Sequence, residues 1–187
     1  MSVFPVMRVK EMLTRLLLGV SFLTAMAGAA LAVDDAAIAG ARPPAKLSAF
    51  GFFADLADQV PAAGVMPFAP ATPLFTDHAE KFRFVYMPEG TSAAYDPQEV
   101  FHFPVGTALI KTFSYPAAER PGGYRHIETR LLLRQESGWH AWAYVWNDEQ
   151  SDAELRIAGA KIPLIIALPN GDTKDILYAV PNKNQCK

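Results

Sequence analysis

Cysteine is nearly absent from this sequence. Its 187 residues include one, Cys186, so an intramolecular disulfide framework and a zinc site built from cysteines are both excluded. An excess of charge of one sign is also absent, because 17 Lys and Arg stand against 19 Asp and Glu. That balance argues against a general binder of nucleic acid or of anionic membranes. Hydrophobic residues make up 51% of the chain, which is enough to bury a core and excludes disorder throughout.

The common signatures of catalysis and nucleotide binding are also missing. The sequence contains no G-x-G-x-x-G, no G-x-x-x-x-G-K-[ST], no G-x-S-x-G and no H-E-x-x-H. The four histidines are His78, His102, His126 and His140, and none pairs with another at metal-ligand spacing. The acidic residues Asp148, Glu149, Asp152 and Glu154 match no calcium-loop spacing and favour a charged turn. The sequence therefore predicts no catalytic residue and no metal ligand.

Residues 1–32 are typical of a secretory signal peptide. Basic residues come first, and Leu16 to Ala29 then carries no charge. Ala30-Leu31-Ala32 has the small-x-small pattern that signal peptidase requires. The apolar run is shorter than the about 20 residues that a bilayer-spanning helix needs. We expect cleavage after Ala32 and a periplasmic or secreted product without a stable membrane anchor.

The remaining chain divides into a tether and one domain. Residues 33–46 are rich in alanine and contain two adjacent prolines, which predicts a flexible tether. Residues 47–60 have apolar side chains at helical spacing, with Ser48 as an N-cap and Pro61 as the stop, so one short helix is predicted there. Four prolines make 61–76 an extended loop. The β-rich domain is expected to cover residues 47–181.

The domain beyond this loop is predicted to be all-β. Short β-branched and aromatic runs separated by turn residues lie at 82–87, 107–115, 125–134, 139–146, 153–157, 162–168 and 173–180. Pro163 predicts that its strand is an edge or a bulged strand. The tetrapeptide at 169–172, Pro-Asn-Gly-Asp, predicts a tight turn before the last strand. This pattern predicts an antiparallel sandwich or barrel with one short N-terminal helix.

The runs 125–134 and 139–146 predict a hairpin across Ser137-Gly138. A loop of these residues would set Leu133 opposite Trp142, Leu131 opposite Tyr144 and Thr129 opposite Trp146, with aliphatic and aromatic side chains on one face. Ile127 should share the face of Thr129. The opposite face should carry His126, Glu128, Arg130 and Arg134.

The residues of this hairpin leave two functional questions open. Trp142, Tyr144 and Trp146 are either core residues or an exposed stacking platform of a carbohydrate-binding module. Glu128 and Arg130 are either a solvated ion pair or part of a ligand site. With His126 they would form the centre of a hydrolase whose site assembles from distant residues.

The C-terminal residues Cys186-Lys187 also have two interpretations. They match the first half of a C-x-x-C-H haem-attachment motif, which needs two thiols for thioether bonds and a histidine for the iron. They equally match a free thiol in a frayed tail. The residues alone favour the free thiol.

Several stretches carry a family resemblance that covers about residues 46–187. They are Leu47-Ser48, Gly51-Phe52-Phe53, Thr72-Pro73-Leu74-Phe75-Thr76-Asp77, Phe103-Pro104-Val105-Gly106-Thr107, Ile127-Glu128-Thr129-Arg130-Leu131, Tyr144-Val145-Trp146-Asn147 and Pro181-Asn182-Lys183-Asn184-Gln185-Cys186-Lys187. On these stretches the chain resembles the N-terminal region of a family of exported bacterial proteins whose longer members are described as diheme c-type cytochromes.

The resemblance implies a role beside a haem protein. In the family the tail continues as Gly-Cys-His, so the resemblance implies that Cys186 is the first haem-linking thiol and that 182–187 begin a truncated haem-motif tail. Haem c is implied for longer members, whereas this chain alone is expected to hold no cofactor and to have no catalytic activity. The implied function is that of an exported accessory domain in periplasmic electron transfer. Its expected partner is a haem domain or a periplasmic redox protein, and not nucleic acid.

Overall fold

The computed structural model describes residues 32–185. The expected signal peptide therefore lies outside the described residues apart from Ala32, and Cys186 lies outside them too. No helix within 32–185 is long and apolar enough to cross a membrane. The described part is mainly antiparallel β-structure with one short α-helix, which confirms the all-β prediction.

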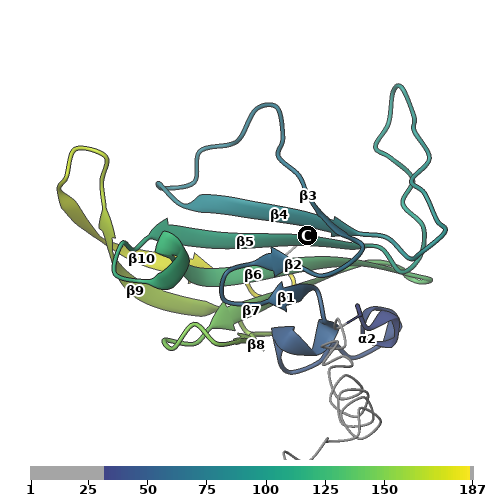
Figure 1. Cartoon of the computed structure of the whole chain (residues 1–187), viewed down its shortest axis with the longest axis horizontal. Helices are drawn as coiled ribbons and strands as arrows, with labels where there is room; N and C mark the ends of the chain where they lie inside the picture. Colours follow the sequence, from purple (N-terminus) through teal and green to yellow (C-terminus); the bar gives the residue numbers. More distant parts are fainter. Residues whose placement is uncertain (1–31, 186–187) are drawn as a thin grey trace, which may run out of the picture. The chain divides into compact units, whose positions relative to one another are not determined.

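A six-stranded antiparallel sheet forms the centre of the domain, in the order β3-β4-β5-β6-β7-β8 (Figure 1). The bounds are β3 Val65–Pro67, β4 Glu80–Tyr86, β5 Ala108–Pro116, β6 Tyr124–Gln135, β7 Gly138–Trp146 and β8 Ala153–Leu155. A 3-10 turn, η2 (Pro121–Gly123), precedes β6. Strands that are neighbours in this order are also neighbours along the chain, so short connections suffice.

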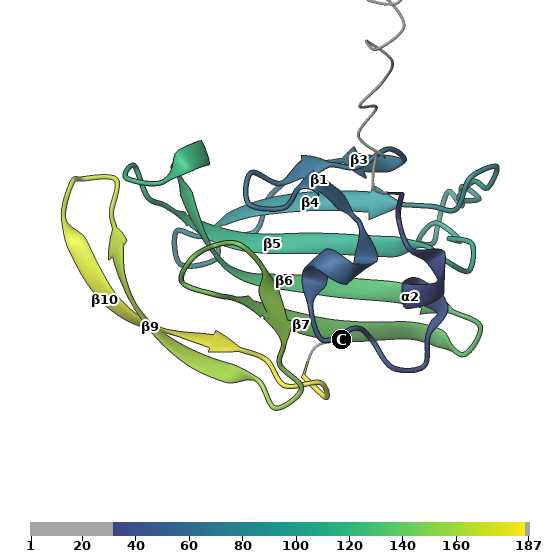
Figure 2. The same ribbon diagram turned by 60° about the horizontal axis from the view of Figure 1, so that its bottom comes forward.

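The N-terminal segment covers the first face of this sheet (Figure 2). It comprises α2 (Asp35–Ala39), η1 (Leu47–Phe50), β1 (Phe53–Asp55) and β2 (Val60–Pro61). Ile38 and Phe50 are 0% exposed, and both belong to the same apolar cluster as Leu131. Burying these side chains is what fixes the segment on the sheet.

The prediction of a flexible tether at 33–46 is wrong. The Asp34 carboxylate caps α2 by accepting from the Ala37 N–H at 3.0 Å. Gln135 of β6 donates from Nε2 to the carbonyls of Ile38 and Gly40, at 2.8 and 2.9 Å. The alanine-rich composition gave no sign that Ile38 is buried. It also gave no sign that a side chain on β6 donates to the carbonyls at the end of the helix.

The predicted helix over 47–60 is also wrong in its extent. Only η1 is helical, and Gly51 ends it in a left-handed conformation with φ 67°. After Gly51 the chain pairs Phe53 with Pro61 as a two-stranded ribbon. Of the apolar residues that mimicked helical spacing, Phe52 and Phe53 are buried because this ribbon packs on the sheet, whereas Val60 is 47% exposed. Part of the predicted loop 61–76 likewise forms β3.

The last two strands, β9 (Ala160–Ala167) and β10 (Thr173–Val180), form a separate hairpin that packs on the second face of the sheet (Figures 1 and 2). The apolar cluster between them contains Phe113 and Ile127 of the sheet together with Leu164, Ile166, Tyr178 and Val180 of the hairpin. The tight turn at 169–172 is confirmed, with Leu168 N bonded to the Asp172 carbonyl at 2.8 Å. Within the described chain β9 pairs only with β10, so Pro163 lies on an edge strand as predicted.

The hairpin of β6 and β7 forms, but its turn lies one residue earlier than predicted. Gln135 pairs with Gly138, which places Leu133 opposite His140, Leu131 opposite Trp142 and Thr129 opposite Tyr144. Gly138, with φ 120°, takes the first strand position instead of a turn position. The resulting shift of two residues keeps the paired side chains of 129–133 and 140–144 on their predicted faces.

A β-bulge in β6 changes the predicted faces at its N-terminal end. Phe113 pairs with Glu128, but Ser114 pairs with His126, which leaves Ile127 as an extra residue. The extra residue reverses the alternation. Ile127 therefore joins the cluster on the second face, and His126 lies against Trp146 on the first face, 4.7 Å between ring centroids.

Candidate functional site

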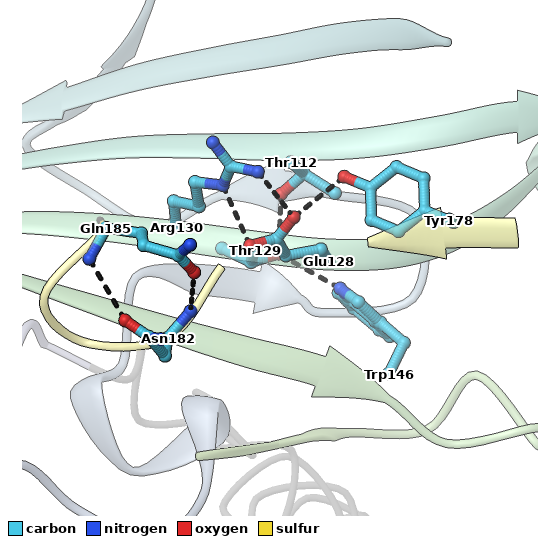
Figure 3. Close-up of polar contacts among 8 residues, drawn as sticks. All are labelled: Thr112, Glu128, Thr129, Arg130, Trp146, Tyr178, Asn182 and Gln185. Carbon is cyan, nitrogen blue, oxygen red and sulfur yellow. Dashed lines mark hydrogen bonds and ion pairs between the residues drawn. The ribbon is translucent and has the colours of Figure 1, made fainter. Parts of the chain in front are cut away.

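A fully buried carboxylate lies on the second face, where the hairpin of β9 and β10 covers the sheet. Glu128 is 0% exposed. Arg130 Nε and Nη2 donate to its Oε1 and Oε2 at 2.8 and 3.0 Å, and the Tyr178 hydroxyl donates to Oε2 at 2.7 Å (Figure 3). Burial, together with the charge of Glu128, raises the pKa of Tyr178, so the phenol remains a donor. The interpretation of Glu128 as part of a solvated face is wrong because the hairpin covers it.

Three cationic side chains lie side by side on neighbouring strands near this carboxylate. Arg83 of β4 pairs directly with Lys111 of β5, and Lys111 pairs directly with Arg130 of β6. We call these three residues the cationic row. Like charges at directly opposite positions repel and destabilise a sheet. Lys111 and Arg130 both contact the Phe113 ring, each at 4.6 Å from its centroid, which shows that the row lies on the second face.

Lys111 is the member of the row with the least compensation. Within residues 32–185 its ammonium has no hydrogen-bond or ion-pair partner, and it lies over the Phe113 ring. Burial lowers the pKa of Lys111 and repulsion by Arg83, Arg130 and Lys81 lowers it further, while the charge of Glu128 opposes this shift only in part. The row therefore holds more positive charge than Glu128 neutralises.

The cationic row borders two hollows. The first, which we call the hairpin hollow, has a volume of about 550 Å³ and is walled by Lys111, Phe113, Tyr115, Tyr178, Thr76 and Asp77. Tyr115 is 5% exposed, and its buried hydroxyl has no hydrogen-bond partner in the described structure. The second, the tail hollow, has a volume of about 370 Å³, and its wall includes the whole cationic row together with Gln185.

The backbone at the mouth of the hairpin hollow is unusual. Asp77 and His78 both have positive φ, 38° and 63°, although neither is glycine. Non-glycine residues adopt this region at a cost, and such residues concentrate at functional sites. Lys81 holds the loop by donating from Nζ to the Leu74 carbonyl and to Thr76 Oγ1.

A third hollow, of about 690 Å³, lies elsewhere and includes His126 in its wall. The His126 Nε2 donates to the Ala57 carbonyl at 2.8 Å, and its Nδ1 accepts from the buried Ser114 hydroxyl at 2.6 Å. Both ring nitrogens are therefore used, and burial lowers the pKa of His126. The bulge also separates His126 from Glu128 and Arg130. The three residues consequently do not assemble the hydrolase centre that the sequence suggested.

Three aromatic residues of β7 form core, whereas Trp139 is 40% exposed. Trp142 and Trp146 are each 6% exposed, and Tyr144 is 0% exposed. The Tyr144 hydroxyl donates to the Pro44 carbonyl at 2.8 Å, and Trp146 Nε1 donates to Thr129 Oγ1 at 2.9 Å. The N-terminal segment covers these rings, so they are not a stacking platform for sugars.

Three of the four acidic residues in the predicted charged turn have structural contacts. Asp148 pairs with Arg125 at 3.0 Å, and Asp152 accepts from the Ser48 hydroxyl at 2.7 Å. Glu154 pairs with Arg156 at 3.0 Å. No group of three or more metal-ligating side chains comes together among residues 32–185.

Comparison with protein-family models, with curated proteins and with solved structures found no match to this chain.

Proposed function

We propose that this chain is the exported β-rich accessory domain of a c-type cytochrome-like protein in periplasmic electron transfer. In this proposal the second face of the sheet contacts the haem-bearing segment or an acidic redox partner. The observation that carries the proposal is the position of the tail. Gln185, the residue before the expected first haem-linking thiol, lies in the wall of the tail hollow beside the cationic row.

The tail reaches this position through several contacts. The Lys183 N–H donates to the Ile157 carbonyl at 3.0 Å, and the Lys183 ammonium lies 4.2 Å from the Trp142 ring centroid. Asn182 Oδ1 accepts from the Asn184 N–H at 3.0 Å. Figure 3 shows the two bonds between Asn182 and Gln185: Asn182 Oδ1 accepts from the Gln185 N–H at 3.1 Å, and Gln185 Oε1 accepts from the Asn182 N–H at 3.2 Å. A segment joined through Cys186 would begin beside the cationic row.

The chemistry of this face suits an acidic partner. The cationic row carries more positive charge than its one buried carboxylate balances, and charge complementarity of this kind orients a docking partner. Haem c would supply redox chemistry only in a chain that also contains the rest of the attachment motif. Residues 32–185 contain no cysteine, so the thioether bonds cannot be made within them. The part that we assign to this chain is contact with the haem segment, not haem ligation.

Two measurements test the proposal. The DNA after codon 187 is read in all frames, and the protein is isolated from the periplasmic fraction of its source, stained for covalent haem and weighed intact. Codons for Gly-Cys-His followed by a haem-protein sequence, together with a haem-positive product, would support it. Unrelated downstream sequence together with a haem-negative product would overturn it, and the β-domain would then function alone.

A further inference from the structure

The hairpin hollow combines an uncompensated cation, a buried hydroxyl without a partner and aromatic walls. We propose that it binds a small monocarboxylate with an apolar body, with Lys111 holding the carboxylate. This inference does not rest on the cytochrome-like role, because it concerns the isolated chain and a small molecule.

The charge argument begins with the cross-strand register. Lys111 lies directly between two arginines, and two like neighbours on one face raise the cost of its charge. Arg130 is already bonded to Glu128, whereas Lys111 has no ion-pair partner within residues 32–185. An anion in the hollow would give Lys111 a charge-assisted hydrogen bond in a partly desolvated site, where such bonds are strong.

The second argument is the Tyr115 hydroxyl. A phenol that is buried without a hydrogen bond loses about 1–3 kcal/mol of solvation free energy, so such groups are rare in folded proteins. Tyr115 lines the same hollow as Lys111 and lies four residues further along β5. A carboxylate oxygen in the hollow is an acceptor for this hydroxyl. The donor and the cation therefore point to the same ligand chemistry.

The walls restrict the ligand further. Phe113, Tyr178 and Ile176 add apolar surface to a wall that also carries polar groups, so the hollow can contact an organic body as well as an anionic group. Asp77 also lines the hollow, and Glu128 lies behind it through its bond to Tyr178. These two carboxylates repel a second negative charge on the ligand. A monoanion is therefore favoured over phosphate.

The experiment uses the purified full chain and isothermal titration calorimetry. The probes are benzoate, its neutral analogue benzamide and inorganic phosphate. We expect saturable one-site binding of benzoate, at least about tenfold tighter than that of benzamide, because the charge-assisted bond is lost in the amide. Equal binding of benzoate and benzamide would overturn the proposal. Tighter binding of phosphate would overturn the carboxylate assignment.

Variants locate the site. Lys111→Met should weaken benzoate binding about tenfold through loss of one charge-assisted bond, whereas Lys174→Met, at an exposed position of β10 outside the wall of the hollow, should bind as the parent does. Tyr115→Phe retains the ring and removes only a hydroxyl without a partner, so its melting temperature should not fall while benzoate binding weakens. Unchanged benzoate binding in folded Lys111→Met would overturn the proposal. A haem-negative native protein would overturn only the cytochrome-like role.

Discussion

The Tyr178 hydroxyl on β10 donates a hydrogen bond to Glu128 Oε2 on β6, at 2.7 Å, across 50 positions of the chain. This bond joins the hairpin of β9 and β10 to the sheet at a carboxylate that is 0% exposed. Burial of a charge is costly unless the charge is paired and hydrogen-bonded. The position of the hairpin and the pairing of the buried Glu128 carboxylate therefore depend on the same few contacts.

Removal of the arginine should be more damaging than removal of both charges. Arg130→Met leaves Glu128 buried with Tyr178 as its donor, and we expect a loss of about 3 kcal/mol in the free energy of unfolding, the low end for a broken buried pair because the Arg130 side chain is 33% exposed. The double variant Glu128→Leu/Arg130→Met should lose less. Urea denaturation measures both. A loss in the double variant as large as that in Arg130→Met, or larger, would contradict this account.

Removal of the Tyr178 hydroxyl measures how much its hydrogen bond to Glu128 contributes to stability. Tyr178→Phe retains the apolar packing and takes one donor from a buried carboxylate, so we expect a loss of about 1.5–3 kcal/mol. Tyr95→Phe is the matched control, because Tyr95 is 74% exposed and should change stability little. Urea denaturation of both variants gives the comparison, and equal stabilities would show that the bond contributes nothing.

The sequence predicted the strands well because their signals are local. Alternation and β-branched runs identified all of β4 to β10 within a few residues, and Pro163 correctly marked an edge strand. The N-terminal segment was mistaken because its order comes from elsewhere. Ile38 is fixed by a cluster on the sheet and by Gln135, 97 positions away, and no pattern within 33–46 reports such contacts.

The candidate site was only partly predictable for the same reason. Glu128 and Arg130 are two apart on one strand, so the sequence suggested their pairing. Tyr178 and Lys111 were missed, because the first reaches the site by packing of the hairpin and the second by the register of β5. The bulge at Ile127 also places His126 on the face opposite to the predicted one. No turn residue beside Ile127 indicates this bulge in the sequence.

The N-terminal segment should contribute substantially to stability. Ile38→Ala removes a side chain that is 0% exposed, and we expect a loss of about 2–4 kcal/mol in urea denaturation. Ile165→Ala on β9 is the matched control, since Ile165 is 74% exposed and should lose far less. A loss near zero for Ile38→Ala would restore the prediction of a tether.

Acidification should destabilise the fold through His126. Burial lowers the pKa of this imidazole below its ordinary value of 6.5, against a smaller opposing effect of its bond to the Ala57 carbonyl and of the Asp58 charge. The unfolded chain therefore takes up a proton at a higher pH than the native fold does. The associated stability is complete above about pH 6.5 and declines as the pH falls from there toward the folded-state pKa.

Non-titrating variants separate this effect from that of the carboxylates. The free energy of unfolding is measured by urea denaturation at about pH 7.5 and about pH 5, and His126→Gln should lose less of it on acidification than the parent. His102→Gln is the control for the substitution itself, because the His102 side chain is 70% exposed. Equal losses in the parent and His126→Gln would mean that the buried imidazole does not stay neutral in the fold, and the Ala57 and Ser114 contacts would then have to accommodate a charged ring.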